Sequence, residues 1–104
     1  MMMLTKAIQN KLPKLYATDG VKMEDKSIVC KFFTPWSSWT WYVFEGEYNT
    51  EAKTWEFFGM VDNGRDDPEM GYFQLSELES IRGPFGLKIE RDRHFKNKFG
   101  RDIK

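Results

Sequence analysis

The stretch Trp39-Thr40-Trp41-Tyr42-Val43-Phe44 decides the fold of this chain. Alternate side chains of an extended strand point to opposite faces. Trp39, Trp41 and Val43 therefore share one face, and Tyr42 and Phe44 share the other. A sheet with one face in water alternates apolar with polar residues, and this stretch does not. We expect either that helices cover both faces of the strand or that one aromatic face is kept for a partner.

The neighbouring sequence is also aromatic, since 11 of the 17 Phe, Trp and Tyr residues lie between Phe32 and Phe58. Most of these rings are expected to form the core, with four expected to be buried: Phe32, Trp41, Phe44 and Phe57. Trp36 lies in a turn between Pro35 and two serines. It is the best candidate for an exposed aromatic anchor.

The alternation of apolar and polar residues predicts strands over residues 27–34, 39–44, 54–61, 71–75 and 87–89. Polar connectors are expected at 45–53 and 62–70. Thr5 can cap a helix over about residues 6–12, and Ser76 with Glu79 fits a capping box for a helix near 77–82, with Leu78 and Ile81 facing inward. Short turns between successive strands favour an antiparallel order. The sequence thus predicts one α+β domain over residues 1–104, with a sheet of about four or five strands and two short helices.

Size and composition fit a globular domain: 104 residues, of which 40% are hydrophobic and 31% charged. Charge is unevenly distributed, although the total is zero. Residues 45–79 carry ten acidic residues against two basic ones, and residues 88–104 carry seven basic residues against three acidic ones. We expect residues from about 91 to 104 to form a charged, flexible C-terminal segment. A segregated charge distribution of this kind can steer a charged partner.

Few residues offer catalytic chemistry. Cys30 lies in an apolar run and is expected to be a small buried thiol that forms no internal disulfide. His94 has no nucleophile or orienting partner in the sequence around it. The acidic residues 62–69 do not match a calcium-binding loop, because Gly64 and Asp67 stand where an acidic ligand and a glycine are required. We expect neither an enzyme nor a bound cofactor or metal, and no segment is apolar enough to span a membrane. The expected location is the cytoplasm.

Several motifs together resemble a family of small uncharacterised bacterial proteins labelled as a domain of unknown function. The resemblance covers nearly the whole chain and rests on these stretches: Leu4-Thr5-Lys6 with Lys11-Leu12-Pro13, Lys31-Phe32-Phe33-Thr34-Pro35-Trp36 with Trp39-Thr40-Trp41-Tyr42, Gly71-Tyr72-Phe73 with Leu75 and Leu78-Glu79, and Gly86-Leu87 with Ile89-Glu90-Arg91-Asp92. The family is found largely on plasmids, integrative elements and phages. It supplies no catalytic motif, so the resemblance implies an accessory protein of a mobile element, and inhibitors of host defence are prominent among such proteins.

The first functional hypothesis is a non-enzymatic inhibitor that binds a host defence protein or ribonucleoprotein complex, such as a CRISPR effector. Its predicted binding residues are Trp36, Trp39, Asp66, Asp67 and Glu69. Aromatic anchors supply much of the energy of protein interfaces, and the acidic residues can occupy a basic channel of the partner.

The alternative is a single-stranded nucleic-acid-binding protein that serves transfer or replication of the element. Its predicted binding residues are Trp36, Trp39, Arg91, Arg93 and Lys96, because bases stack on aromatic rings while cations follow the phosphates. A homodimer through the spare aromatic face is compatible with both hypotheses.

Overall fold

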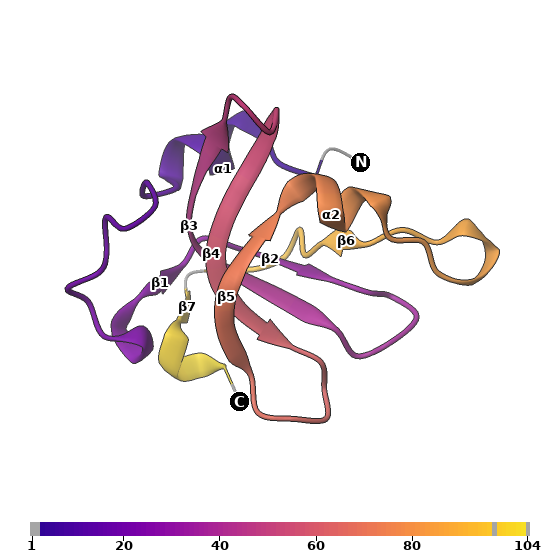
Figure 1. The fold of residues 1–104 in the computed structure, drawn as a ribbon. Coiled ribbons are helices and arrows are strands. Elements are labelled where there is room, and N and C mark those ends of the chain that lie inside the picture. Colours follow the sequence, from indigo (N-terminus) through magenta and orange to yellow (C-terminus); the bar gives the residue numbers. More distant parts are fainter. Residues whose placement is uncertain (1–2, 97, 104) are drawn as a thin grey trace.

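The chain folds around one five-stranded antiparallel sheet with the strand order β5-β4-β3-β2-β6 (Figure 1). The computed structural model describes residues 3–96 and 98–103. The strands of this sheet are β2 (Cys30–Phe33), β3 (Thr40–Asn49), β4 (Thr54–Asp62), β5 (Glu69–Gln74) and β6 (Glu90–Arg91). A second small sheet pairs β1 (Ser27–Ile28) with β7 (Lys98–Phe99). Two short helices, α1 (Lys6–Lys11) and α2 (Leu75–Ser80), complete the predicted α+β fold.

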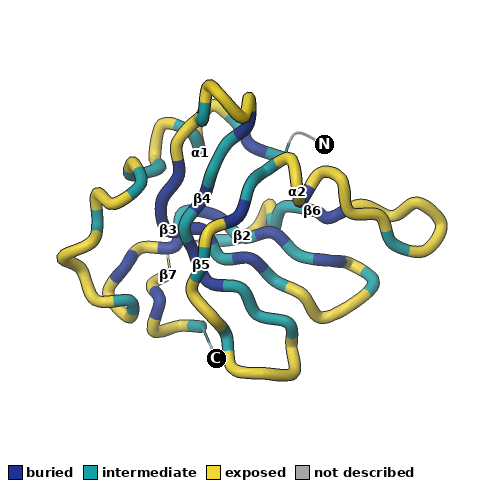
Figure 2. The backbone as a smooth tube through the Cα atoms, in the orientation of Figure 1, coloured by how far each residue is buried: buried dark blue, intermediate teal, exposed yellow. Residues whose placement is uncertain are grey.

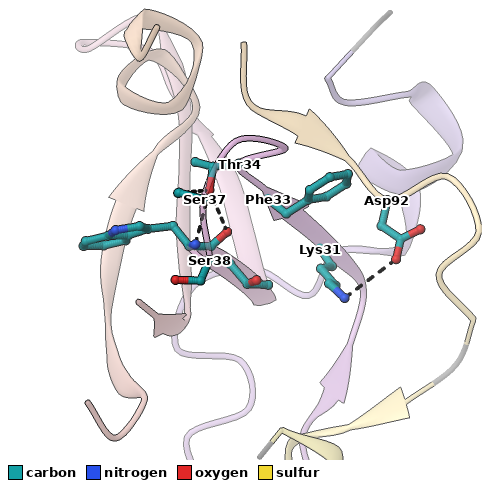
Figure 3. A pocket seen from close by; sticks show the side chains of 8 residues that line it. Lys31, Phe33, Thr34, Ser37, Ser38 and Asp92 are labelled. Carbon is teal, nitrogen blue, oxygen red and sulfur yellow. Dashed lines mark hydrogen bonds and ion pairs between the residues drawn. The ribbon is translucent and has the colours of Figure 1, made fainter. Parts of the chain in front are cut away.

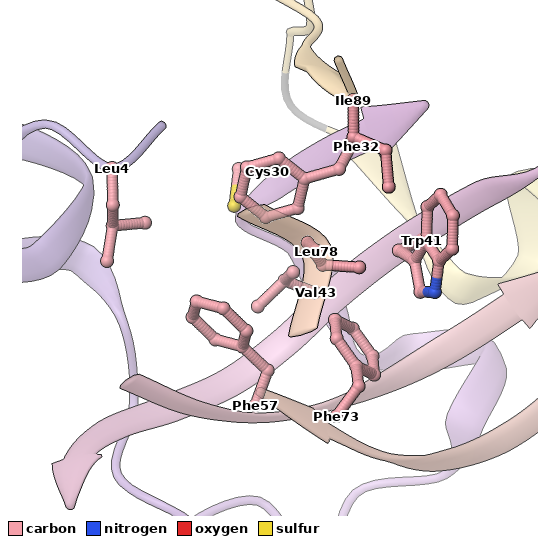
Figure 4. Close-up of a cluster of buried hydrophobic side chains, with 9 residues drawn as sticks. All are labelled: Leu4, Cys30, Phe32, Trp41, Val43, Phe57, Phe73, Leu78 and Ile89. Atoms are coloured by element: carbon pink, nitrogen blue, oxygen red, sulfur yellow. The ribbon is translucent and has the colours of Figure 1, made fainter. Parts of the chain in front are cut away.

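Side chains pack on both faces of the sheet, but the α-helices of the described residues cover only one of them, so the first of the two alternatives drawn from residues 39–44 holds in part. One face carries the larger core, drawn in Figure 4, which consists of Leu4, Cys30, Phe32, Trp41, Val43, Phe57, Phe73, Leu78 and Ile89. We call it the first face, and α1 and α2 contribute Ile8 and Leu78 to its cover. All four rings predicted to lie in the core are buried.

The opposite face, which we call the second face, carries a smaller core of Ile28, Phe44 and Met60. The described residues that cover this core do not lie in α-helices. A 3-10 turn contributes Met23, and the C-terminal region contributes Phe95 and Ile103. Phe58 and Tyr42 are only partly buried there. Figure 2 shows buried backbone along the central strands and exposed backbone at the connecting loops.

The strand β3 is longer than predicted, because residues 45–49 continue it instead of forming a polar connector. The register with β4 shifts between Val43 and Glu45, which marks a β-bulge. A bulge lets two successive residues point to the same face. Phe44 and Glu45 are both buried, and Gly46 to Asn49 then pair with β4. Polarity alone predicted a loop for these residues, and their pairing with β4 shows that they form a strand.

Two predictions near α2 are wrong. The N-cap is Gln74 and the capping carboxylate is Glu77, which accepts a hydrogen bond from the Gln74 N–H at 2.8 Å; Ser76 and Glu79 do not form the predicted box. The helix ends at Ser80, so Ile81 is its C-cap and lies exposed instead of facing inward.

The last strand of the large sheet is also displaced, because Glu90–Arg91 and not residues 87–89 pair with β2. Ile89 is nevertheless buried in the first face.

The C-terminal residues lie against residues 25–28. The N–H of Gly100 donates to the Lys26 carbonyl at 2.9 Å, and Arg101 forms an ion pair with Asp25. Phe95 packs on the second face, whereas Phe99 is exposed. Among the described residues, no helix is long and apolar enough to cross a membrane.

Candidate functional site

The turn between β2 and β3 is held by its own hydroxyl groups. The Thr34 N–H donates to the Trp39 carbonyl at 3.0 Å, and the Trp39 N–H donates to the Thr34 hydroxyl at 3.2 Å. Thr34 and Ser37 share a further hydrogen bond between their side chains at 2.5 Å (Figure 3). These bonds fix the backbone on both sides of Trp39.

The acidic loop between β4 and β5 is ordered in a similar way. The Asn63 side-chain oxygen accepts hydrogen bonds from the N–H groups of Arg65 and Asp66, at 2.8 and 2.9 Å. Its amide group donates to the Asp66 carboxylate at 3.0 Å. A side chain that bonds to the backbone two and three residues ahead stabilises a turn. Asn63 therefore sets the direction of the Asp66 side chain.

The two loops are in direct contact. The Ser38 hydroxyl donates to the Asn63 carbonyl at 2.8 Å. Gly64 has a φ of 81°, and a side chain there would overlap Ser38. Glycine is the residue that adopts this conformation without strain. The contact brings Trp39 beside the acidic loop, which the sequence separates by more than twenty residues.

The result is a shallow depression of about 270 Å³, which we call the acidic surface, lined by Trp39, Val61, Asn63, Asp66, Asp67 and Glu69. Trp39 is 44% exposed and stacks on the buried Trp41, with ring centres 5.7 Å apart. Within residues 3–96 and 98–103, the carboxylates of Asp66, Asp67 and Glu69 form no ion pair. Four of the five residues predicted to bind a protein partner thus lie together.

Trp36, the fifth of these residues, lies elsewhere. It is half-buried against the first face, and a side chain on Gly83 would overlap its ring. Trp39 and not Trp36 is therefore the exposed tryptophan of the turn. Proline and serine neighbours made Trp36 look exposed in the sequence, but the segment around Gly83 covers its ring.

The basic residues predicted for nucleic-acid binding do not form one group. Arg91 is half-buried in β6 beside β2, and Arg93 lines a hollow with Glu79 and Glu90. Lys96 lines a different hollow. The structure leaves these three cations without a common surface.

A basic groove that the sequence did not predict lies on the second face. Its two hollows measure about 310 and 540 Å³ and share Lys31 and Asp92, whose charged groups are 3.8 Å apart (Figure 3). The larger hollow adds Tyr42, His94, Lys96 and Lys98, together with the acidic residue Asp102. Lys31 and Tyr42 are cross-strand partners, and the ammonium lies 5.8 Å from the ring centre. The hairpin register was the signal for this pair, since it places both residues on one face.

The buried carboxylate of Glu45 is a further feature that the sequence did not predict. It accepts hydrogen bonds from the Tyr16 and Thr18 N–H groups, at 2.8 and 3.0 Å, and from the Thr18 hydroxyl. The Lys26 ammonium lies 3.7 Å away and is also buried. Burial raises the pKa of Glu45, but the hydrogen bonds from Thr18 and Tyr16, together with the charge of Lys26, outweigh it and lower the pKa below its ordinary value. The Glu45 carboxylate is therefore occupied by contacts within the protein and stabilises the fold.

Nucleophilic chemistry at Cys30 is disfavoured. Burial raises the pKa of the thiol to about 12, against a smaller lowering effect of the Arg91 charge. The reactive form of cysteine is the thiolate, which is therefore scarce at neutral pH. Among the described residues, no group of three or more His, Cys, Asp or Glu side chains is placed to hold a metal ion.

Comparison with known protein families assigns the chain to a family. A family model described as "Protein of unknown function (DUF2958)" matches residues 3–100. No curated protein and no solved structure matches the chain.

Proposed function

The chain belongs to the DUF2958 family, whose description names no function, and from its surface we propose that it is a non-enzymatic protein that binds a basic partner protein. The acidic surface is the proposed contact. Trp39 is the apolar anchor, and Asp66, Asp67 and Glu69 are the charges that meet cations of the partner. Exposed aromatic residues that are held rigidly lose little conformational freedom on binding.

One observation carries this proposal: an exposed tryptophan, whose ring is stacked on a buried one, lines the same depression as three acidic side chains that form no ion pair within the described part of the chain. Charges of one sign around an apolar centre favour a partner of opposite charge and speed its association. Two other acidic residues of segment 45–79 contribute less, because Glu45 is buried and Glu47 accepts a hydrogen bond from the Leu15 N–H.

The proposed partner is a host defence protein or ribonucleoprotein complex, and the chain acts in the cytoplasm as its inhibitor. The support for this step is the resemblance to proteins of plasmids, integrative elements and phages. Effectors that hold nucleic acid do so in positively charged channels. An acidic surface with a hydrophobic anchor fits such a channel.

A binding titration at several salt concentrations tests the charge mechanism. The variant Asp66→Asn/Asp67→Asn/Glu69→Gln keeps the size of the side chains and removes their charge. We expect weaker binding of the partner and a flatter dependence on salt, because screening acts on the charges that were removed. Unchanged affinity at low salt would remove the acidic surface from the mechanism.

The basic groove favours a second function, the binding of single-stranded nucleic acid. Lys31, Lys96 and Lys98 line the same hollow as Tyr42, and the Lys31 ammonium lies near the ring. In such an arrangement cations can hold phosphates while a base stacks on the ring. Such binding weakens steeply with salt. Titration with oligonucleotides tests it: quenching of intrinsic fluorescence that is lost in Lys31→Gln/Lys96→Gln would support the groove, and no quenching at low ionic strength would exclude it.

A further inference from the structure

The strand β5 forms one edge of the large sheet. It pairs with β4 along its whole length, from Val61↔Glu69 to Glu56↔Gln74. Among the residues that the structure describes, no strand pairs with its outer side. An edge strand presents unpaired N–H and C=O groups, which are a template for a further strand.

The hydrogen bonds of the chain identify which groups of β5 point outward. The N–H of Gln74 donates to the Glu77 side chain, so it does not point toward β4. Backbone direction alternates along a strand with a period of two. The N–H and C=O groups of Met70 and Tyr72 therefore also point away from β4, while those of Gly71 and Phe73 pair with it.

The side chains at this edge are apolar on the second face. Tyr72 is 54% exposed. The centre of its ring lies 4.9 Å from the ring centre of Phe58 and 6.2 Å from that of Tyr16. Tyr16 is 62% exposed and has a φ of 69°, a conformation that is unfavourable for a tyrosine. The Tyr16 N–H donates a hydrogen bond to Glu45, which fixes the backbone at this residue. An added strand would cover both tyrosines.

The charges at the two ends of β5 limit which kind of strand can be added to this edge. Asp66, Asp67 and Glu69 stand at the beginning of β5. The exposed Glu79 follows its end in α2, together with Glu77, whose carboxylate also accepts the hydrogen bond from Gln74. A second copy paired antiparallel to β5 would bring the beginning of one strand beside the end of the other. Acidic residues would then meet acidic residues, which is destabilising. The charges instead favour a basic strand.

We propose that β5 is the docking edge for an extended basic segment of the partner protein, which adds to the sheet as a sixth strand. Its backbone pairs with Met70 and Tyr72, its apolar side chains cover Tyr72 and Tyr16, and its lysine or arginine residues meet the acidic residues at both ends. Glu69 belongs both to β5 and to the acidic surface, so the two contacts are continuous. This inference rests on the proposed function and specifies the shape of the partner.

Two synthetic peptides test the pairing. In one, lysine alternates with valine over ten residues; in the other, proline replaces each valine, so that charge and length are kept but strand pairing is disfavoured. We expect the full chain to bind the valine peptide more tightly. Hydrogen exchange is expected to slow at the amides of Met70 and Tyr72 in the complex, and to change little at those of Gly71 and Phe73, which are already paired.

Matched variants separate the backbone from the side chain. Tyr72→Ala removes the ring and keeps the N–H, whereas Tyr72→Pro removes both at a position whose N–H does not pair with β4. Loss of one backbone hydrogen bond is expected to weaken binding about fivefold beyond the effect of alanine. Met70→Pro and Met70→Ala form a second pair, and circular dichroism confirms that each variant is folded.

Each outcome decides between the two proposals. Proline variants that bind as the alanine variants do, or equal binding of both peptides, would overturn the strand addition. If Asp66→Asn/Asp67→Asn/Glu69→Gln still weakens binding in that case, the proposed function stands without it. If neither the charge variant nor the proline variants alter binding, both proposals fall. A stable homodimer whose β5 amides are protected, measured by light scattering and exchange, would also overturn the inference.

Discussion

Glu45 and Lys26 hold residues 16–26 to the second face of the sheet. The pair is almost fully buried and Thr18 bonds to both side chains, so the two charges are compensated inside the protein. The sequence did not predict this pair, because a glutamate in a polar stretch is usually solvated and only the bulge at Glu45 turns it inward. By contrast, burial of Cys30 was predicted correctly from its apolar neighbours alone.

Removal of the Glu45 charge should strongly destabilise the fold. Glu45→Gln leaves the Lys26 ammonium buried without its counter-charge, and we expect the free energy of unfolding to fall by about 3 kcal/mol. Lys26→Met/Glu45→Gln removes both charges and is expected to recover most of that loss. Denaturation by urea measures the free energy of unfolding of the wild type, the single variant and the double variant. A loss below about 0.5 kcal/mol, the range of ordinary surface changes, would contradict this role.

The Glu45 carboxylate should also make the free energy of unfolding depend on pH. Its pKa is lower in the folded protein than the unfolded value of about 4.3, so the folded state binds fewer protons there. Its contribution is complete above that value and is lost as the pH falls through the folded pKa. We expect the difference in stability between the wild type and Glu45→Gln to narrow from pH 5 downward. A difference that stays constant down to about pH 2 would be inconsistent with this linkage.

The strands illustrate what periodicity can and cannot predict. The alternation in residues 54–61 predicted β4 within one residue, since aromatic side chains on both faces leave few other arrangements. The sequence predicts a loop for residues 45–49, because the bulge that buries Glu45 interrupts the two-residue alternation by which a strand is detected. The two-residue strands β6 and β7 are defined by their partners in distant sequence, and such short segments carry no pattern of their own.

Two glycines that face each other across β4 and β5 should respond differently to substitution. A side chain on Gly59 would overlap the Tyr42 carbonyl, whereas one on Gly71 meets nothing within 4 Å. We expect Gly59→Ala to reduce the free energy of unfolding by about 3 kcal/mol, because the backbone of β3 cannot yield without breaking pairs. Gly71→Ala is the matched control, with a change within about 1 kcal/mol. Equal effects in thermal unfolding would show that the approach of β3 to β4 is not as close as described.

Over the whole molecule, folding decides which charges of the acidic and basic segments are buried and which share a surface. The acidic segment 45–79 looked like one solvated surface, but Glu45 is used internally, and three of the exposed acidic residues, Asp66, Asp67 and Glu69, lie together beside Trp39. The contact of residues 34–39 with the acidic loop was not visible in the sequence, yet residue type alone selected four of the residues that meet there. The groove around Tyr42 was missed because its cations come from two segments that lie far apart in the sequence, Lys31 in one and Lys96 with Lys98 in the other.

Capture of partners from a host lysate tests the central claim most directly. The tagged wild type and the variant Asp66→Asn/Asp67→Asn/Glu69→Gln are compared, each with and without nuclease, and the recovered proteins are quantified. We predict a basic partner in stoichiometric amount that survives nuclease treatment and is largely lost with the variant. Recovery of nucleic acid alone, abolished by nuclease and unaffected by the variant, would contradict the account and assign the binding to the basic groove.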